Sequence, residues 1–145
     1  MPNFVFIPSE AVLSQYAGFR IARIDGRQTP TLKAFYEAIA VALDFPDYFG
    51  YNLDSLDELL NDFDWLEDEK VVLYIANSDA FLAQEPKEEK IVDLLNILDA
   101  TAEDWKYVDE EVEEISPMEL VIALDPSPRM QDLFDREDFA YQVVS

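Results

Sequence analysis

The chain alternates between short apolar runs and longer segments in which apolar residues recur at helical spacing. Three apolar runs predict strands, at residues 19–24, 70–75 and 120–124, and a shorter run at 4–7 predicts an edge strand or an arm. The run at 70–75 is nearly continuous in β-branched and other apolar residues, which is typical of a central strand buried on both faces.

Between these runs the apolar spacing predicts three helices. The first follows a hydroxyl cap and a proline at 29–31 and ends before Phe45, where Pro46 stops it. The second starts after Asn52, a plausible N-cap, with leucines facing inward, and the third runs from about residue 86 to 99.

The order strand, helix, helix, strand, helix, strand requires crossover connections, which favour parallel strands. We therefore predict a single α/β domain over residues 1–145, with a small three-stranded parallel sheet covered by helices. Its core spans about 19–125, with N-terminal and C-terminal extensions. An acidic stretch at 105–116 reads as a loop or a short extra helix, and 126–145 as an amphipathic tail.

Composition sharpens this picture by exclusion. Half of the 145 residues are apolar and 13% are aromatic, which is ample for a packed core even at a net charge of -22. With no Cys and no His, the chain lacks disulfides, thiolate nucleophiles, imidazole metal ligands and a Ser-His-Asp triad. We expect that the protein is not an enzyme and uses no cofactor or metal, with carboxylate-only chemistry as the remaining enzymatic alternative.

The N-terminus lacks the basic and apolar regions of a secretory signal, and no segment approaches the roughly 20 apolar residues of a membrane span. The expected location is the cytoplasm.

The negative charge is unevenly distributed. Residues 1–43 carry three acids and four bases (+1), whereas residues 44–145 carry 29 acids and six bases (-23). Between Asp44 and Glu69 there are ten acids and no base. Such a surface repels phosphates, so neither nucleic acid nor an anionic membrane is an expected partner. A basic protein would suit this charge, although an ordinary solvated acidic surface accounts for it equally well.

Residues 45–62 hold the densest set of candidate binding residues. Asp54, Asp57 and Glu58 stand at i, i+3 and i+4 on the predicted second helix, and three aromatic residues precede them at 48, 49 and 51. A solvated helix face would show the same pattern. Metal sites and glycosidase pairs need carboxylates that converge from several segments, which one convex helix face does not supply. An interface for Arg and Lys side chains fits this pattern best.

The run at 46–56, PDYFGYNLDSL, resembles the signature of the barstar family, whose members are intracellular inhibitors of ribonucleases such as barnase. A looser resemblance extends over about 19–125. It implies a parallel three-stranded sheet and an inhibitor or immunity protein that covers the active site of a basic ribonuclease or nuclease toxin. Acidic side chains would then lie where the substrate phosphate binds, and we expect the free inhibitor to be a monomer.

The resemblance also implies roles by position. Tyr48 and Asn52 match loop residues of the family, Asp54 matches the first helix aspartate, and Glu58 takes the place of the principal aspartate with one more methylene. Asp57 stands where the prototype has a tryptophan. The expected partner-binding set is Tyr48, Phe49, Gly50, Asn52, Asp54, Asp57, Glu58 and Phe63.

Two questions stay open at the level of sequence. The family's acidic contact from a later helix corresponds to either Asp93 or Asp99. The alternative function is a non-inhibitory binding or regulatory module for another basic protein.

Overall fold

The computed structural model describes residues 2–62, 65, 68–106 and 118–144. Its strands are β1 (Phe4–Phe6), β2 (Arg20–Asp25), β3 (Lys70–Ala76), β4 (Glu119–Leu124) and β5 (Tyr141–Val143). The α-helices are α1 (Leu32–Ala42), α2 (Leu53–Leu60), α3 (Glu88–Lys106) and α4 (Pro128–Arg136), and two short 3₁₀ helices are η1 (Glu10–Gln15) and η2 (Gly26–Gln28).

The strands form one parallel sheet in the order β2-β3-β4-β1-β5. The predicted α/β class with a parallel sheet is confirmed, but the prediction of a three-stranded sheet is wrong because the described part of the chain forms a sheet of five strands. β1 is also no edge strand: Phe4 is paired with Ile122 of β4 on one side and with Tyr141 of β5 on the other. Both neighbours lie far away in sequence, so the local pattern of a three-residue strand does not reveal them.

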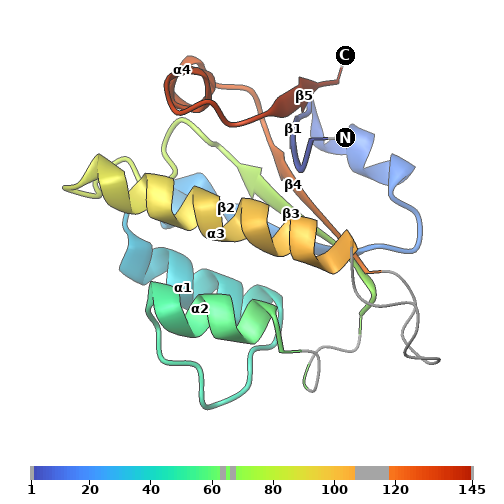
Figure 1. Ribbon diagram of the computed structural model, residues 1–145. Coiled ribbons are helices and arrows are strands. Elements are labelled where there is room, and N and C mark those ends of the chain that lie inside the picture. The colour runs from blue at the N-terminus through green and yellow to red at the C-terminus, as the bar shows by residue number, and fades with distance from the viewer. Residues whose placement is uncertain (1, 63–64, 66–67, 107–117, 145) are drawn as a thin grey trace.

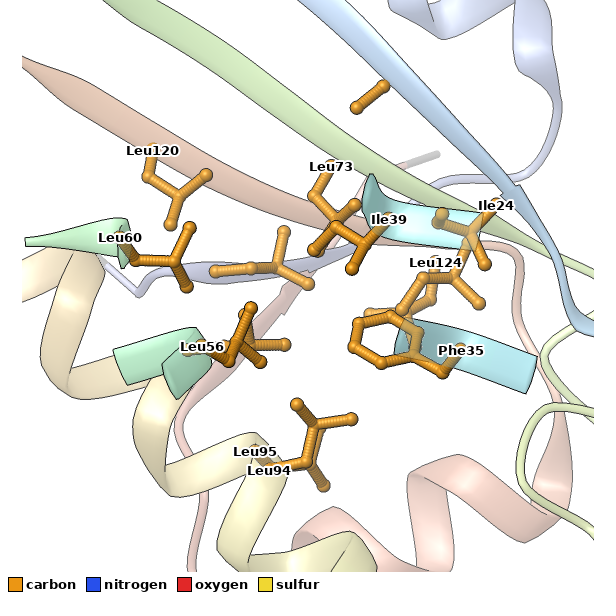
Figure 2. Close-up of a cluster of buried hydrophobic side chains, with 14 of the residues drawn as sticks. Ile24, Phe35, Ile39, Leu56, Leu60, Leu73, Leu94, Leu95, Leu120 and Leu124 are labelled. Atoms are coloured by element: carbon orange, nitrogen blue, oxygen red, sulfur yellow. The ribbon is translucent and has the colours of Figure 1, made fainter. Parts of the chain in front are cut away.

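The two faces of the sheet are covered unequally. Helices α1, α2 and α3 lie on one face, and α4 lies near β1 and β5 (Figure 1). Leucine, isoleucine and phenylalanine side chains from these helices and from the strands meet in the main core shown in Figure 2. The opposite face carries a smaller cluster in which Leu13 of η1 packs with Val5, Val72, Tyr74 and Ala123. No helix in the described ranges is long and apolar enough to cross a membrane.

Helix α3 is longer than predicted. The sequence predicts its end near residue 99, yet the buried stripe continues through Thr101, Ala102 and Trp105 at the same helical spacing. The Trp105 indole Nε1 donates a hydrogen bond to the carbonyl oxygen of Leu60 at 2.8 Å, which ties α3 to the end of α2. The predicted loop or short helix therefore starts within α3, and its remainder at 107–117 lies outside the described residues.

The C-terminal tail packs on the core through aromatic contacts. Phe134 of α4 is fully buried, and its ring lies 4.8 Å from Phe4, 5.3 Å from Phe6 and 5.9 Å from Tyr141, centroid to centroid. Ser127 caps α4 by accepting a hydrogen bond from the amide of Met130. Through β1 and β5, both chain extensions also contribute a strand to the sheet.

Candidate protein-binding surface

Helix α2 separates an apolar face from an acidic one. Leu56, Leu59 and Leu60 are buried in the main core, whereas Asp54, Asp57 and Glu58 are exposed. The apolar residues point the carboxylates outward, because a helix that buries one stripe must present the opposite stripe to solvent.

A compact hydrogen-bond network fixes the start of α2. Asn52 caps the helix, as predicted: its Oδ1 accepts from the amide of Ser55 at 2.8 Å, and its Nδ2 donates to the carbonyl of Gly50 at 3.1 Å. The Gly50 amide in turn donates to the Ser55 hydroxyl at 2.7 Å. A Cβ on residue 50 would lie only 3.2–3.3 Å from Asn52 and Ser55 atoms, so the close approach favours glycine here.

The aromatic loop before α2 divides into one buried and two exposed rings. Phe49 is 4% exposed and packs edge-on against Phe45 at 4.9 Å, so it anchors the loop in the core. Tyr48 and Tyr51 are 65% and 53% exposed. The loop therefore exposes these two tyrosines on the surface, while Phe49 anchors it in the core.

The ends of the loop and of α2 are tied together. The Tyr48 hydroxyl donates to a carboxylate oxygen of Asp62 at 3.3 Å, just beyond the C-terminal end of the helix. This bond places the Tyr48 hydroxyl beside the residue that follows the C-cap of α2, so the loop before the helix and the segment after it lie on one continuous surface.

The three carboxylates differ in their surroundings. Asn61 Nδ2 donates to the carbonyl of Asp57 at 2.8 Å and to its carboxylate at 3.2 Å. Within the described parts of the chain, nothing bonds the side chains of Asp54 or Glu58, and both remain available for charge-assisted pairs with a partner's Arg or Lys. Phe63, the eighth expected partner-binding residue, lies outside the described residues.

A groove beside this surface is not evident from sequence. It encloses about 700 Å³ between α1, α2 and α3, and Asp54 lines it together with Lys90, Asp93 and Asn96 of α3. Polar residues at three-residue spacing on α3 are the sequence signal for that wall.

The groove decides between Asp93 and Asp99, the two acids of α3 that the sequence leaves as alternatives. Asp93 lines the groove beside Asp54, whereas the Asp99 carboxylate accepts a hydrogen bond from Asn3 Nδ2 at 2.9 Å. Asp93 is therefore the acid of α3 that adjoins the candidate surface.

Tyr36 of α1 also lines the groove. Its burial, and secondly the nearby Glu85 carboxylate, raise the pKa of the Tyr36 hydroxyl. The phenol thus remains a neutral hydrogen-bonding group. In the described portion of the chain, no three carboxylates converge as ligands for a metal ion.

Comparison with solved structures gives a likeness of fold. The ORC2 protein of Aeropyrum pernix, solved as ADPNP–ADP complexes, aligns with 97% of this chain at a TM-score of 0.56 and 13% sequence identity. The chain spans 40% of the length of that protein. No curated protein sequence matches the chain.

The sequence predicts a resemblance to the barstar family and does not predict this likeness to an ORC2 protein. That resemblance points to ribonuclease inhibitors and immunity proteins, with extensions that have no counterpart in the prototype. An ORC2 protein has a structure that aligns with nearly the whole chain, but at 13% identity the likeness concerns the fold alone and does not bear on the family.

The family itself is established by sequence. The family described as Barstar (barnase inhibitor) matches residues 19–123, which include β2, α1, the aromatic loop, α2, β3 and α3 and most of β4. The chain therefore belongs to the barstar family.

Proposed function

We propose that this protein inhibits a basic ribonuclease by covering its active site with the acidic face of α2 and the aromatic loop. The observation that carries the proposal is the exposed set Asp54, Asp57 and Glu58 beside the exposed Tyr48 and Tyr51, within a barstar-family chain. Aromatic rings flanked by carboxylates form a surface suited to a partner rich in Arg and Lys.

The mechanism is mimicry of phosphate by carboxylates. A ribonuclease places cationic side chains around the scissile phosphate, and these repel one another when the site is empty. Asp54 and Glu58 are four residues apart on one helix, so their carboxylates would reach neighbouring cations together. They offer no bond that the enzyme can cleave, and the active site stays occupied.

The surrounding charge supports rapid capture. A net charge of -22 creates a field that attracts a basic protein and raises its association rate, most strongly at low ionic strength. Fast capture suits a protein that silences a ribonuclease before cellular RNA is cut. We accordingly propose a cytoplasmic, non-enzymatic, monomeric inhibitor of the cell's own ribonuclease or of a nuclease toxin.

Titration of ribonuclease activity tests this function. Purified barnase, and any basic ribonuclease encoded beside this protein, should lose RNA-cleaving activity as the protein approaches equimolar amounts. Glu58→Gln and Asp54→Asn should each weaken binding by about 2–5 kcal/mol, or roughly 30-fold or more, because a buried cation in the enzyme then lacks its partner.

Glu137→Gln is the matched control, because Glu137 is exposed and directly follows α4, a helix that lies apart from α2 (Figure 1). It should leave inhibition unchanged. Full ribonuclease activity at excess protein would exclude inhibition of that enzyme. Binding without inhibition would identify a regulatory module instead.

A further inference from the structure

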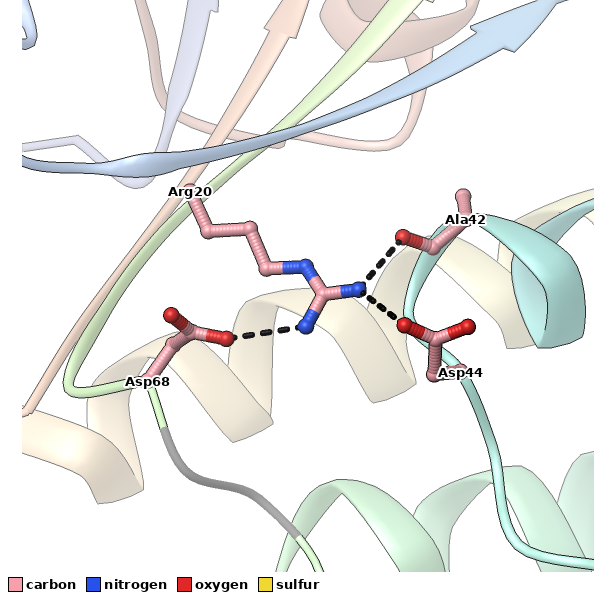
Figure 3. Close-up of polar contacts among 4 residues, drawn as sticks. All are labelled: Arg20, Ala42, Asp44 and Asp68. Carbon is pink, nitrogen blue, oxygen red and sulfur yellow. Dashed lines mark hydrogen bonds and ion pairs between the residues drawn. The ribbon is translucent and has the colours of Figure 1, made fainter.

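One arginine bonds both ends of the segment that carries the candidate surface. Arg20, at the start of β2, donates from Nη1 to the Asp68 carboxylate at 2.9 Å and from Nη2 to the Asp44 carboxylate at 2.9 Å (Figure 3). Nη2 also donates to the carbonyl of Ala42 at 3.2 Å. Asp44 follows the end of α1 and Asp68 precedes β3, so the aromatic loop and α2 lie between the two anchored carboxylates.

The anchored segment, residues 44–68, has an unfavourable charge of its own. It lies within the stretch of ten acids without a base that runs from Asp44 to Glu69. Of the ion pairs that join described residues, the two that reach this segment both come from Arg20. Repulsion among the acids favours an open segment, and Arg20 opposes that opening at both ends.

The geometry makes this contact stronger than an ordinary surface pair. The Arg20 side chain is 29% exposed and that of Asp68 38%, so solvent screens their pair only in part, whereas Asp44 is 84% exposed and its pair with Arg20 is screened more strongly. Asp68, and then Asp44, raise the pKa of the Arg20 guanidinium, against the opposing effect of burial. Its planar fork serves two carboxylates and a carbonyl at once, which the single ammonium of a lysine does not do as well.

We propose that Arg20 is a positioning residue for the partner-binding surface. By bonding Asp44 and Asp68 it holds the loop and α2 in one arrangement against the sheet before a partner arrives. This inference rests on the proposed function for its biological use. A preorganised surface loses less conformational entropy on binding, so affinity depends on Arg20 even though a partner need not touch it.

Hydrogen exchange of the free protein tests the positioning without any partner. In Arg20→Gln, backbone amides at 45–62 should exchange up to about tenfold faster than in the unmodified protein, which corresponds to the loss of the partly screened pair with Asp68 and the more exposed pair with Asp44. Amides of α3 and β4 should keep their rates. Arg136→Gln is the matched control, because Arg136 also bonds two carboxylates, Glu88 and Asp132, away from the segment.

Binding to barnase supplies the second measurement. Arg20→Gln should raise the dissociation constant about tenfold. Arg136→Gln should leave it unchanged at a similar loss of global stability, and Arg20→Lys should give an intermediate value. A general role in stability would instead make the two glutamine variants equal.

The outcomes separate the two proposals. Equal exchange rates at 45–62 in Arg20→Gln and the unmodified protein would overturn the positioning role. Faster exchange confined to that segment, with no binding of barnase by any variant, would support the positioning role and contradict the proposed inhibition of this enzyme.

Discussion

At the scale of single residues, the Asn52 side chain fixes the start of α2 in the candidate surface. The Asn52 side chain both accepts from Ser55 and donates to Gly50, so it joins the loop to the first turn of α2. Asn52→Ala should therefore lower the free energy of unfolding by about 1 kcal/mol, the usual effect of removing a cap, with some further loss from the Gly50 contact. Urea denaturation monitored by circular dichroism measures the change.

Asn52→Asp provides the comparison for this residue. An aspartate keeps the acceptor for the Ser55 amide but loses the donor to Gly50, so its stability should lie between those of the unmodified protein and Asn52→Ala. If Asn52→Ala unfolds at the same urea concentration as the unmodified protein, the cap does not stabilise the loop.

At the scale of elements, local signals predict some parts of the fold well. Asn52 is the cap that the sequence predicts, a hydroxyl cap lies within the predicted helix entry at 29–31, where the structure identifies it as Thr31, and the strand at 70–75 is buried through its centre. The position of Phe49 is not evident from sequence, because an aromatic ring in a loop can anchor it or face a partner. Its burial against Phe45 follows from tertiary packing. The groove beside Asp54 likewise exists only once α2 and α3 are packed together.

The terminal elements show why pairing is harder to predict than secondary structure. β1 and β5 each contain three residues, and their partners lie more than 100 residues away in sequence or on another short strand. A run of three apolar residues is too short to show a strand's hydrophobic pattern, so it does not predict which two strands lie beside it. The sequence signal that did exist was the amphipathic pattern around Phe134, which marks a packed helix and not a detached tail.

That packing leads to a prediction about α4. Phe134→Ala should lower the free energy of unfolding by about 3–5 kcal/mol, because it leaves a cavity among Phe4, Phe6 and Tyr141. Gln142→Ala, on the exposed side of β5, should change it little. Denaturant midpoints at constant slope are the measurement. A change below about 1 kcal/mol in Phe134→Ala would show that α4 contributes little to the core.

For the whole molecule, the charge acts in opposite directions on folding and on binding. Six ion pairs join described residues, and 22 negative charges remain in excess over the full chain. Like charges held together in the compact state repel one another, whereas the same field attracts a basic partner. Under the proposed function, the protein trades folding stability for speed of capture.

Salt should therefore stabilise the free protein while slowing its association with a basic ribonuclease. Between about 0.01 M and 1 M NaCl the screening length falls from roughly 30 Å to roughly 3 Å, which removes long-range repulsion but leaves close pairs such as Arg20–Asp68 largely intact. The urea midpoint should rise with salt and then level off. Neutralising four exposed acids (Asp79→Asn, Glu89→Gln, Asp104→Asn and Glu137→Gln) should raise the midpoint at low salt and reduce its salt response. A urea midpoint that falls as salt increases would mean that attraction within ion pairs outweighs repulsion among the acids. The acidic surface would then not destabilise the folded state.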